Sequence, residues 1–317
     1  MKQTNNAIKF LMAQYRAIFK NANIAMLAAI AASALAAGQA QADDLTATNW
    51  GNASGDALTV GGTSPTYGKI DLTATADEDK ANNNSFKLTI KGGADNKING
   101  AASDKGSFTA TKGTLVIEGA DATGTKLIIG DVSGAKATFG TVSVNKGTVD
   151  LTKGTLTAGT INLGVDDTEA GTTVAIVDIA GGTLGNKADD AQHIAASTIN
   201  ILDGAKVSGK AATSKIAGKV VMTGGELISD NTQKLTIDGT LNATGGKLTN
   251  SGSLVLNGDA TFGGELTLDN KGAIDFAGAK NGETQTLTVT KDIFENKLFA
   301  GDGKVSGAGT TLSLIHI

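Results

Sequence analysis

Length, composition and charge exclude several classes of protein. The chain has 317 residues, a formal net charge of −4 at pH 7, no cysteine and a single arginine, Arg16. The absence of cysteine excludes a disulfide scaffold and any metal or catalytic site built on thiolates. An acidic chain with almost no arginine is not expected to bind nucleic acid, because phosphate recognition relies on clustered Arg and Lys.

Residues 1–42 have the three-part composition of a secretory signal peptide, and we expect this leader to be helical. Its four basic residues lie in its first half, and it has no acidic residue. Residues 24–37 are uncharged and Ala-rich, and they are fewer than the about 20 residues that a membrane span needs. Ala40 and Ala42 are small, as signal peptidase requires, which places cleavage between Ala42 and Asp43. The alternative is an uncleaved N-terminal anchor.

The leader is long, with a basic amphipathic stretch, KFLMAQYRAIFKN, before its apolar core. This layout resembles the extended signal peptides of large secreted proteins of Gram-negative bacteria, namely autotransporters and related adhesins. The resemblance implies that the leader's partner is the export machinery.

The rest of the chain has the pattern of short β-strands separated by tight turns. It contains nearly all of the 43 glycines and the only proline, Pro65. Between turns rich in Gly, Asn and Asp, apolar and polar residues alternate over four to six positions, which is the period of a strand with one buried face. Examples are KLTIKGG (87–93), GTLVIEG (113–119), TINILDG (198–204) and SLVLNG (253–258). We therefore predict an all-β structure.

The spacing of these segments favours a parallel β-solenoid (a right-handed β-helix) over a β-sandwich. Strand-like units are expected to begin near Lys219, Glu226, Lys234, Thr240, Lys247, Ser253, Ala260, Glu265 and Ala273. Three such units make a repeat of roughly 20 residues, the length of one solenoid coil. A sandwich would show longer strands, with turn signals every 8 to 12 residues.

The solenoid is predicted for residues 86–311, with deviations at both ends and in one insertion. Residues 43–85 are expected to form an irregular N-terminal cap, with a polar loop at residues 74–84. Residues 185–196 are expected to form an inserted loop or a short helix.

Residues 312–317, LSLIHI, are expected not to belong to the natural protein. They equal the translation of CTGTCTCTTATACACATC, the end of a sequencing-library adapter. The alternative is an ordinary apolar last strand. On the adapter interpretation the chain is an N-terminal fragment without its membrane anchor, and three continuations after residue 311 stay open: more solenoid, an outer-membrane β-barrel or another anchor.

The sequence offers no catalytic, cofactor-binding or metal site. After the leader, and with residues 312–317 set aside, His193 is the single histidine. A zinc site or a Ser–His–Asp triad is therefore not expected. Single carboxylates such as Asp203, Asp238 and Asp259 are interpreted as turn residues. Three acidic clusters could contribute to a calcium site but are interpreted as solvated loops: Asp77–Asp79, Asp166–Asp167 and Asp189–Asp190.

Residues 86–311 resemble the passenger region of autotransporter-type adhesins. The resemblance implies a non-catalytic stalk or adhesin at the outer-membrane surface of a Gram-negative bacterium or outside the cell. Its partners would be glycans or proteins of host or bacterial surfaces. Two other classes stay open: a secreted solenoid enzyme acting on polysaccharide, and a self-assembling extracellular fibre or matrix subunit.

We predict that export removes residues 1–42, because only small side chains fit the signal-peptidase pocket at the positions of Ala40 and Ala42. Mass spectrometry of chain exported by a Gram-negative host should find an N-terminus at Asp43. Ala42→Lys should block processing, whereas Asp43→Asn should not. Recovery of exported chain that still carries its leader would contradict the prediction.

Overall fold

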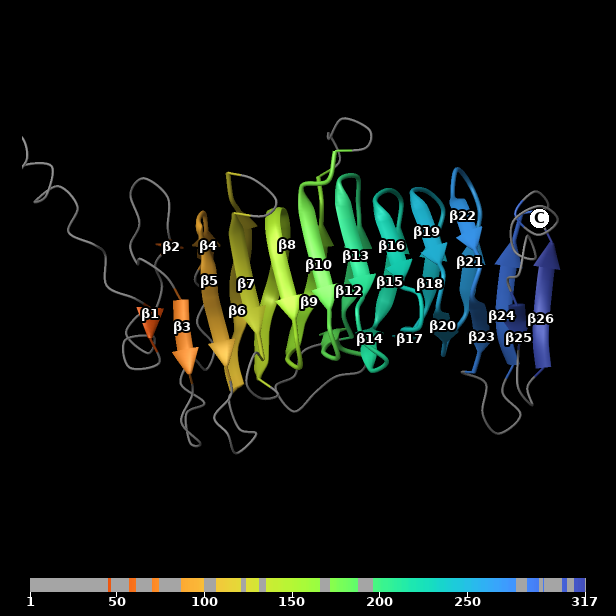
Figure 1. Cartoon of the computed structure of the whole chain (residues 1–317), viewed down its shortest axis with the longest axis horizontal. Coiled ribbons are helices and arrows are strands. Elements are labelled where there is room, and N and C mark those ends of the chain that lie inside the picture. Colours follow the sequence, from red (N-terminus) through yellow and green to blue (C-terminus); the bar gives the residue numbers. More distant parts are fainter. Residues whose placement is uncertain are drawn as a thin grey trace, which may run out of the picture. The chain divides into compact units, whose positions relative to one another are not determined.

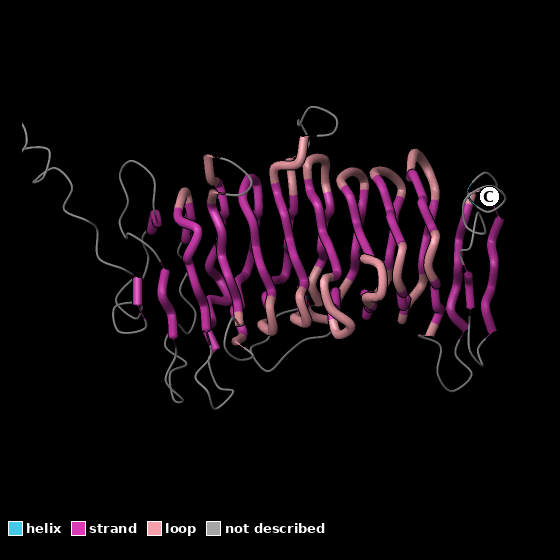
Figure 2. Tube along the Cα trace, viewed as in Figure 1, coloured by secondary structure: helices cyan, strands magenta, loops and turns pink. Residues whose placement is uncertain are grey.

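The structure is a computed structural model of the whole chain (Figures 1 and 2). It describes residues 45–46, 57–60, 70–73, 87–99, 107–120, 124–130, 135–165, 172–187, 196–277, 284–290, 293, 304–306 and 311–316. The chain divides into two compact units, Met1–Ala42 and Asp43–Ile317. The leader and the cleavage residues Ala40, Ala42 and Asp43 lie outside the described residues. Within the described ranges, no helix has the length and apolar character needed to cross a membrane.

The described part of the second unit is an all-β stack of coils, and every strand pairing in it is parallel. The strands lie on three faces, which we call A, B and C in chain order; from β5 to β24, each coil contributes a strand or part of a strand to each face. The row of strands β5, β7, β8, β10, β13, β16, β19 and β22 in Figure 1 belongs to face A. This arrangement confirms the predicted parallel β-solenoid, since a sandwich is built from antiparallel sheets. Its right-handed sense stays a prediction.

Within each face, every strand is hydrogen-bonded to the equivalent strand of the next coil. Face A contains, in order along the stack, β1 (Leu45–Thr46), β3 (Ile70–Thr73), β5 (Gly93–Asn99), β7 (Thr125–Ile129), the end of β8 (Lys136–Leu151), β10 (Ala175–Ile179), β13 (Ala205–Gly209), β16 (Glu226–Ser229), β19 (Lys247–Asn250) and β22 (Thr267–Asn270). Face B contains the first parts of β6 (Ser107–Glu118), β8 and β9 (Thr155–Leu163), then β11 (Thr183–Gly185), β14 (Ser214–Ala217), β17 (Lys234–Asp238), β20 (Ser253–Leu256), β23 (Ala273–Phe276) and β25 (Lys304–Ser306). Face C contains β2 (Ala57–Val60), β4 (Lys87–Ile90), later parts of β6, β8 and β9, then β12 (Thr198–Ile201), β15 (Lys219–Met222), β18 (Leu241–Ala243), β21 (Ala260–Phe262), β24 (Thr284–Val289) and β26 (Thr311–His316).

The predicted repeat is confirmed in the region where it was clearest. Glu226 pairs with Lys247, which pairs with Thr267, so these coils are 21 and 20 residues long. The nine strands β15 to β23 begin within two residues of the predicted positions. The largest deviation is β22, which begins at Thr267 rather than Glu265, because Glu265 belongs to the turn that precedes the strand.

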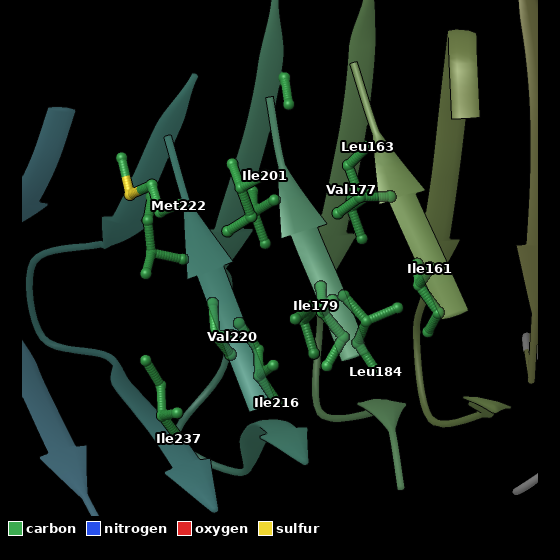
Figure 3. Close-up of a cluster of buried hydrophobic side chains, with 14 of the residues drawn as sticks. Ile161, Leu163, Val177, Ile179, Leu184, Ile201, Ile216, Val220, Met222 and Ile237 are labelled. Carbon is green, nitrogen blue, oxygen red and sulfur yellow. The ribbon is translucent and has the colours of Figure 1, made fainter. Parts of the chain in front are cut away.

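The core is a set of aliphatic rows in which each side chain lies directly above its equivalent in the next coil. Leu227, Leu248 and Leu268 are in register on face A and are at most 3% exposed. Figure 3 shows the same stacking for Leu184, Ile216 and Ile237 of face B. Each fully buried aliphatic side chain contributes about 1.5–3 kcal/mol. The strand alternation seen in the sequence therefore becomes one continuous core.

A polar row lies inside the stack at the end of face A. The Asn250 amide nitrogen donates to the side-chain oxygen of Asn270, 2.8 Å away in the next coil, and to the main-chain oxygen of Ala273 at 3.0 Å. One coil earlier, the Ser229 hydroxyl donates to the main-chain oxygen of Ser253 at 3.0 Å. These bonds satisfy main-chain carbonyls where the chain turns from face A toward face B.

The predicted division of the chain into segments stays a prediction. Strands β1, β2 and β3, from the segment expected to be a cap, continue the parallel pairings of faces A and C. Strand β26 pairs with β24 and includes most of residues 312–317. The loop expected at residues 74–84 lies outside the described residues, as do residues 188–195 of the expected insertion.

We predict that Gly246→Ala destabilises the stack by about 1–3 kcal/mol. Gly246 has φ +74°, and an added Cβ would lie 2.5 Å from the main-chain oxygen of Gly225 in the preceding coil. Gly263→Ala is the control, because its nearest contact would be the flexible Thr290 side chain at 3.3 Å. Urea unfolding followed by circular dichroism would measure both. Equal losses for the two variants would contradict the prediction.

Candidate functional site

Face C carries a shallow, open groove, which we consider as a candidate site. Its volume is about 580 Å³, within the range of small-molecule sites. The groove is lined by Ser143, Asn145, Asn162, Gly164, Val165, Asn200 and Leu202. These residues come from three consecutive coils, through β8, β9 and β12 and the turns that follow them.

Strand alternation directs a row of polar side chains into the groove. Ser143 pairs with Asn162, and Asn162 pairs with Asn200, so the three are in register across the coils. Their neighbours on each strand, such as Ile161 and Leu163, are buried in the core. The polar side chains therefore lie on the outer surface, about 4.8 Å apart along the stack.

Two amides of the row are hydrogen-bonded to each other. The Asn200 amide nitrogen donates to the side-chain oxygen of Asn162 at 2.7 Å. This bond orients both side chains and leaves the Asn162 amide nitrogen as a donor and the Asn200 oxygen as an acceptor. Both residues are half-buried, so these groups are partly shielded from water while they still face the groove.

Main-chain bonds hold the end of the groove in place. The Gly164 N–H donates to the Val144 oxygen at 3.0 Å, and the Val165 N–H to the Asp203 oxygen at 3.1 Å. Gly164 has φ +86°, and a Cβ there would collide with the same Asp203 oxygen. Glycine is therefore required for this turn. The turn places the half-buried side chains of Val165 and Leu202 beside the polar row.

The lining contains no charged, acidic or basic side chain. Its polar groups are the hydroxyl of Ser143 and the amides of Asn145, Asn162 and Asn200. It can donate and accept hydrogen bonds and offer a small apolar contact.

A second feature is the neck of the insertion between β11 and β12. The Ser197 N–H donates to the Asn186 oxygen at 2.7 Å, and the Asn186 N–H donates to the Ser197 hydroxyl at 2.8 Å. The Ser197 hydroxyl in turn donates to the Ala158 oxygen of the preceding coil. The insertion therefore leaves the stack through a closed neck that is bonded to the neighbouring coil.

Asp238 fastens this neck to face B. Its carboxylate lies 2.6 Å from the Lys215 ammonium and 3.0 Å from that of Lys187, two coils earlier. Burial favours a higher pKa for Asp238, but the hydrogen bonds and charges of Lys215 and Lys187 outweigh it and lower this pKa below its ordinary value. Asp238 thus acts as an ion-pair partner, whereas the sequence predicted an ordinary turn residue.

On face A, Asp178 has a pKa shifted in the opposite direction to that of Asp238. Burial raises the pKa of Asp178 above its ordinary value; Lys210 opposes the rise, and the Asp150 carboxylate in the same row adds to it. Lys210 lies 4.0 Å from Asp178 but 3.2 Å from Asp230, and Lys126 lies 2.8 Å from Asp150. Asp178 is therefore the carboxylate with the weakest pairing in this group.

The other residues considered from the sequence contribute little to a site. His193 and the three acidic clusters lie outside the described residues. Asp203 lies in the turn between β12 and β13, as predicted. Asp259 lies between β20 and β21, and its side chain accepts a hydrogen bond from the Thr286 N–H of the next coil at 2.7 Å. Across the ranges that the structure describes, no three His, Cys, Asp or Glu side chains come together as a metal site would require.

Comparison with known proteins gives no relative. No protein-family model, no curated protein and no solved structure matches the chain.

We predict that Asp238→Asn lowers the free energy of unfolding at pH 7. Because the pKa of Asp238 is lowered in the folded chain, its carboxylate stabilises the fold above the ordinary pKa, and this is lost as acid protonates it. The difference from the unmodified chain should therefore shrink below about pH 4.

Asp178→Asn is the matched control, since it also removes one carboxylate, but one whose pKa is raised in the folded chain. The raised pKa of Asp178 means that its charged form opposes folding near neutral pH, so this variant should unfold at higher urea at pH 7. Urea titrations at pH 3, 5 and 7 would measure both variants. The same shift for both would contradict the assignment.

Proposed function

We propose that the chain is an exported, non-catalytic surface protein, a stalk or adhesin-like passenger of a Gram-negative bacterium. The observation that carries the proposal is the uninterrupted parallel pairing from coil to coil. Each coil adds about 4.8 Å of length, so a stack presents a long surface away from the point at which it is attached. The composition of residues 1–42 supports export.

The fold also suits a chain that crosses a membrane before it folds. A single coil cannot bury its aliphatic side chains alone, whereas each added coil completes the hydrogen bonding and packing of the previous one. Folding is therefore not favourable until several coils have crossed the membrane. The absence of cysteine removes the risk of trapping the unfolded chain by wrong disulfides.

The alternative enzyme class finds no supporting observation in the groove. Enzymes that cleave polysaccharide use carboxylates as acid, base or nucleophile. The groove instead presents hydroxyl and amide groups, which do not ionise near neutral pH. Recognition is thus the chemistry that this surface supports best.

Fractionation of a Gram-negative host that produces the chain tests the proposal. We expect the chain in the periplasm or medium, and we expect a Leu27→Arg, Ile30→Arg variant to stay in the cytoplasm, because charges disrupt the apolar core of the leader. Asn21→Gln is the control. The recovered protein should release no reducing ends from cellulose, chitin or pectin. Cytoplasmic retention of the unmodified chain would refute export, and product release would refute the non-catalytic assignment.

A further inference from the structure

The polar row of the groove has definite ends. In the coil before Ser143, the paired position is Val116, and in the coil after Asn200 it is Val221. The row thus consists of three polar positions between two valines. One coil beyond each valine the equivalent position is polar again, at Thr89 and at Asn242, so the valines separate this row from the other polar positions of face C.

We propose that the groove binds a neutral saccharide chain, with about three sugar rings lying along the stack over Ser143, Asn162 and Asn200. A saccharide chain carries hydroxyl groups at a regular interval close to the coil spacing of about 4.8 Å. Hydroxyls can donate to the Asn200 oxygen and accept from the Asn162 amide nitrogen. The two groups left free by the amide–amide bond are thus complementary to such a ligand.

The edge of the groove suits the apolar face of a sugar ring. Val165 and Leu202 lie beside the polar row and are half-buried, so a ring that contacts them covers apolar surface already partly removed from water. No aromatic side chain lines the groove. Since aromatic rings contribute most to many binding sites, we expect an affinity on the order of 1 mM.

The pairing of the strands argues against a peptide. Extended peptides bind sheets by adding a strand to a free edge. The strand at the centre of the groove, β9, is paired with β8 on one side and β12 on the other. No free strand edge is therefore available in β9, and the side chains that line the groove match hydroxyls better than an extended main chain.

The charge of the lining argues against anionic ligands. Nucleic acids and acidic polysaccharides are bound through clustered cations. The groove has none, and the Lys206 and Lys210 side chains belong to face A. A neutral saccharide is therefore the class that the groove supports best.

Calorimetric titration of the purified full chain with cello-oligosaccharides tests the inference. Cellotriose should bind at least threefold more tightly than cellobiose, whereas cellohexaose should gain no more than about fourfold over cellotriose, the statistical factor for its four registers, because the row is interrupted at Val221. Trigalacturonate should bind at least tenfold more weakly than cellotriose.

Asn162→Ala and Asn200→Ala should each weaken cellotriose binding about tenfold, as expected for one or two lost hydrogen bonds. Asn242→Ala is the matched control, since Asn242 lies on the same face beyond Val221 and outside the groove. Circular dichroism must show that every variant keeps its strand content. A variant that loses it is replaced by Asn162→Ser or Asn200→Ser, for which the same loss is expected.

Three results would overturn the inference. These are no binding of cellotriose or triacetylchitotriose to the unmodified chain, equal binding by the groove variants, and binding of trigalacturonate or of an uncharged Gly-Ser hexapeptide as tight as that of cellotriose. The inference rests on the proposed function, because saccharide binding would serve adhesion only if the chain is exported to the cell surface. Because the titration uses purified protein, failure of export and failure of binding give different results.

Discussion

The main-chain hydrogen bonds between neighbouring coils are the interaction on which the rest of the structure depends. A coil of about 20 residues loses roughly 20–40 kcal/mol of backbone entropy when it becomes ordered. Its few inward aliphatic side chains recover only part of this by burial. The remainder comes from bonds and packing to the coils on both sides, as between β16, β19 and β22. Order in one coil therefore requires order in its neighbours.

The same register explains both the core and the candidate site. Because equivalent residues lie above one another, a repeated leucine becomes a continuous apolar row, as with Leu227, Leu248 and Leu268. On the outer side of face C, the same rule aligns Ser143, Asn162 and Asn200. The groove needs no special backbone beyond the turn at Gly164. It arises where three coils carry polar residues at one outward position.

The ion pairs described above lie on faces A and B, and the lining of the groove has no charged side chain. Face A holds the Lys126–Asp150 pair and the Lys210–Asp230 pair, and face B holds the pair of lysines around Asp238. Partly buried pairs of this kind are screened less by salt than exposed ones. They tie coils together on faces A and B and leave the groove of face C to neutral groups. The proposal of a neutral ligand rests on this absence of charge from the lining of the groove.

The sequence by itself determined the strand positions, the coil length and the all-β class, because alternation and Gly or Asn turns are local signals. It predicted β15 to β23 within two residues for this reason. Only the tertiary structure decided which side chains meet. Asn162 and Asn200 are separated by 38 residues, nearly twice the normal coil, because two long segments lie between them, one between β9 and β10 and one between β11 and β12. Asp238 meets Lys187 across two coils in the same way. Such contacts depend on the register between coils, and an inserted segment changes the spacing in sequence without changing the position in space.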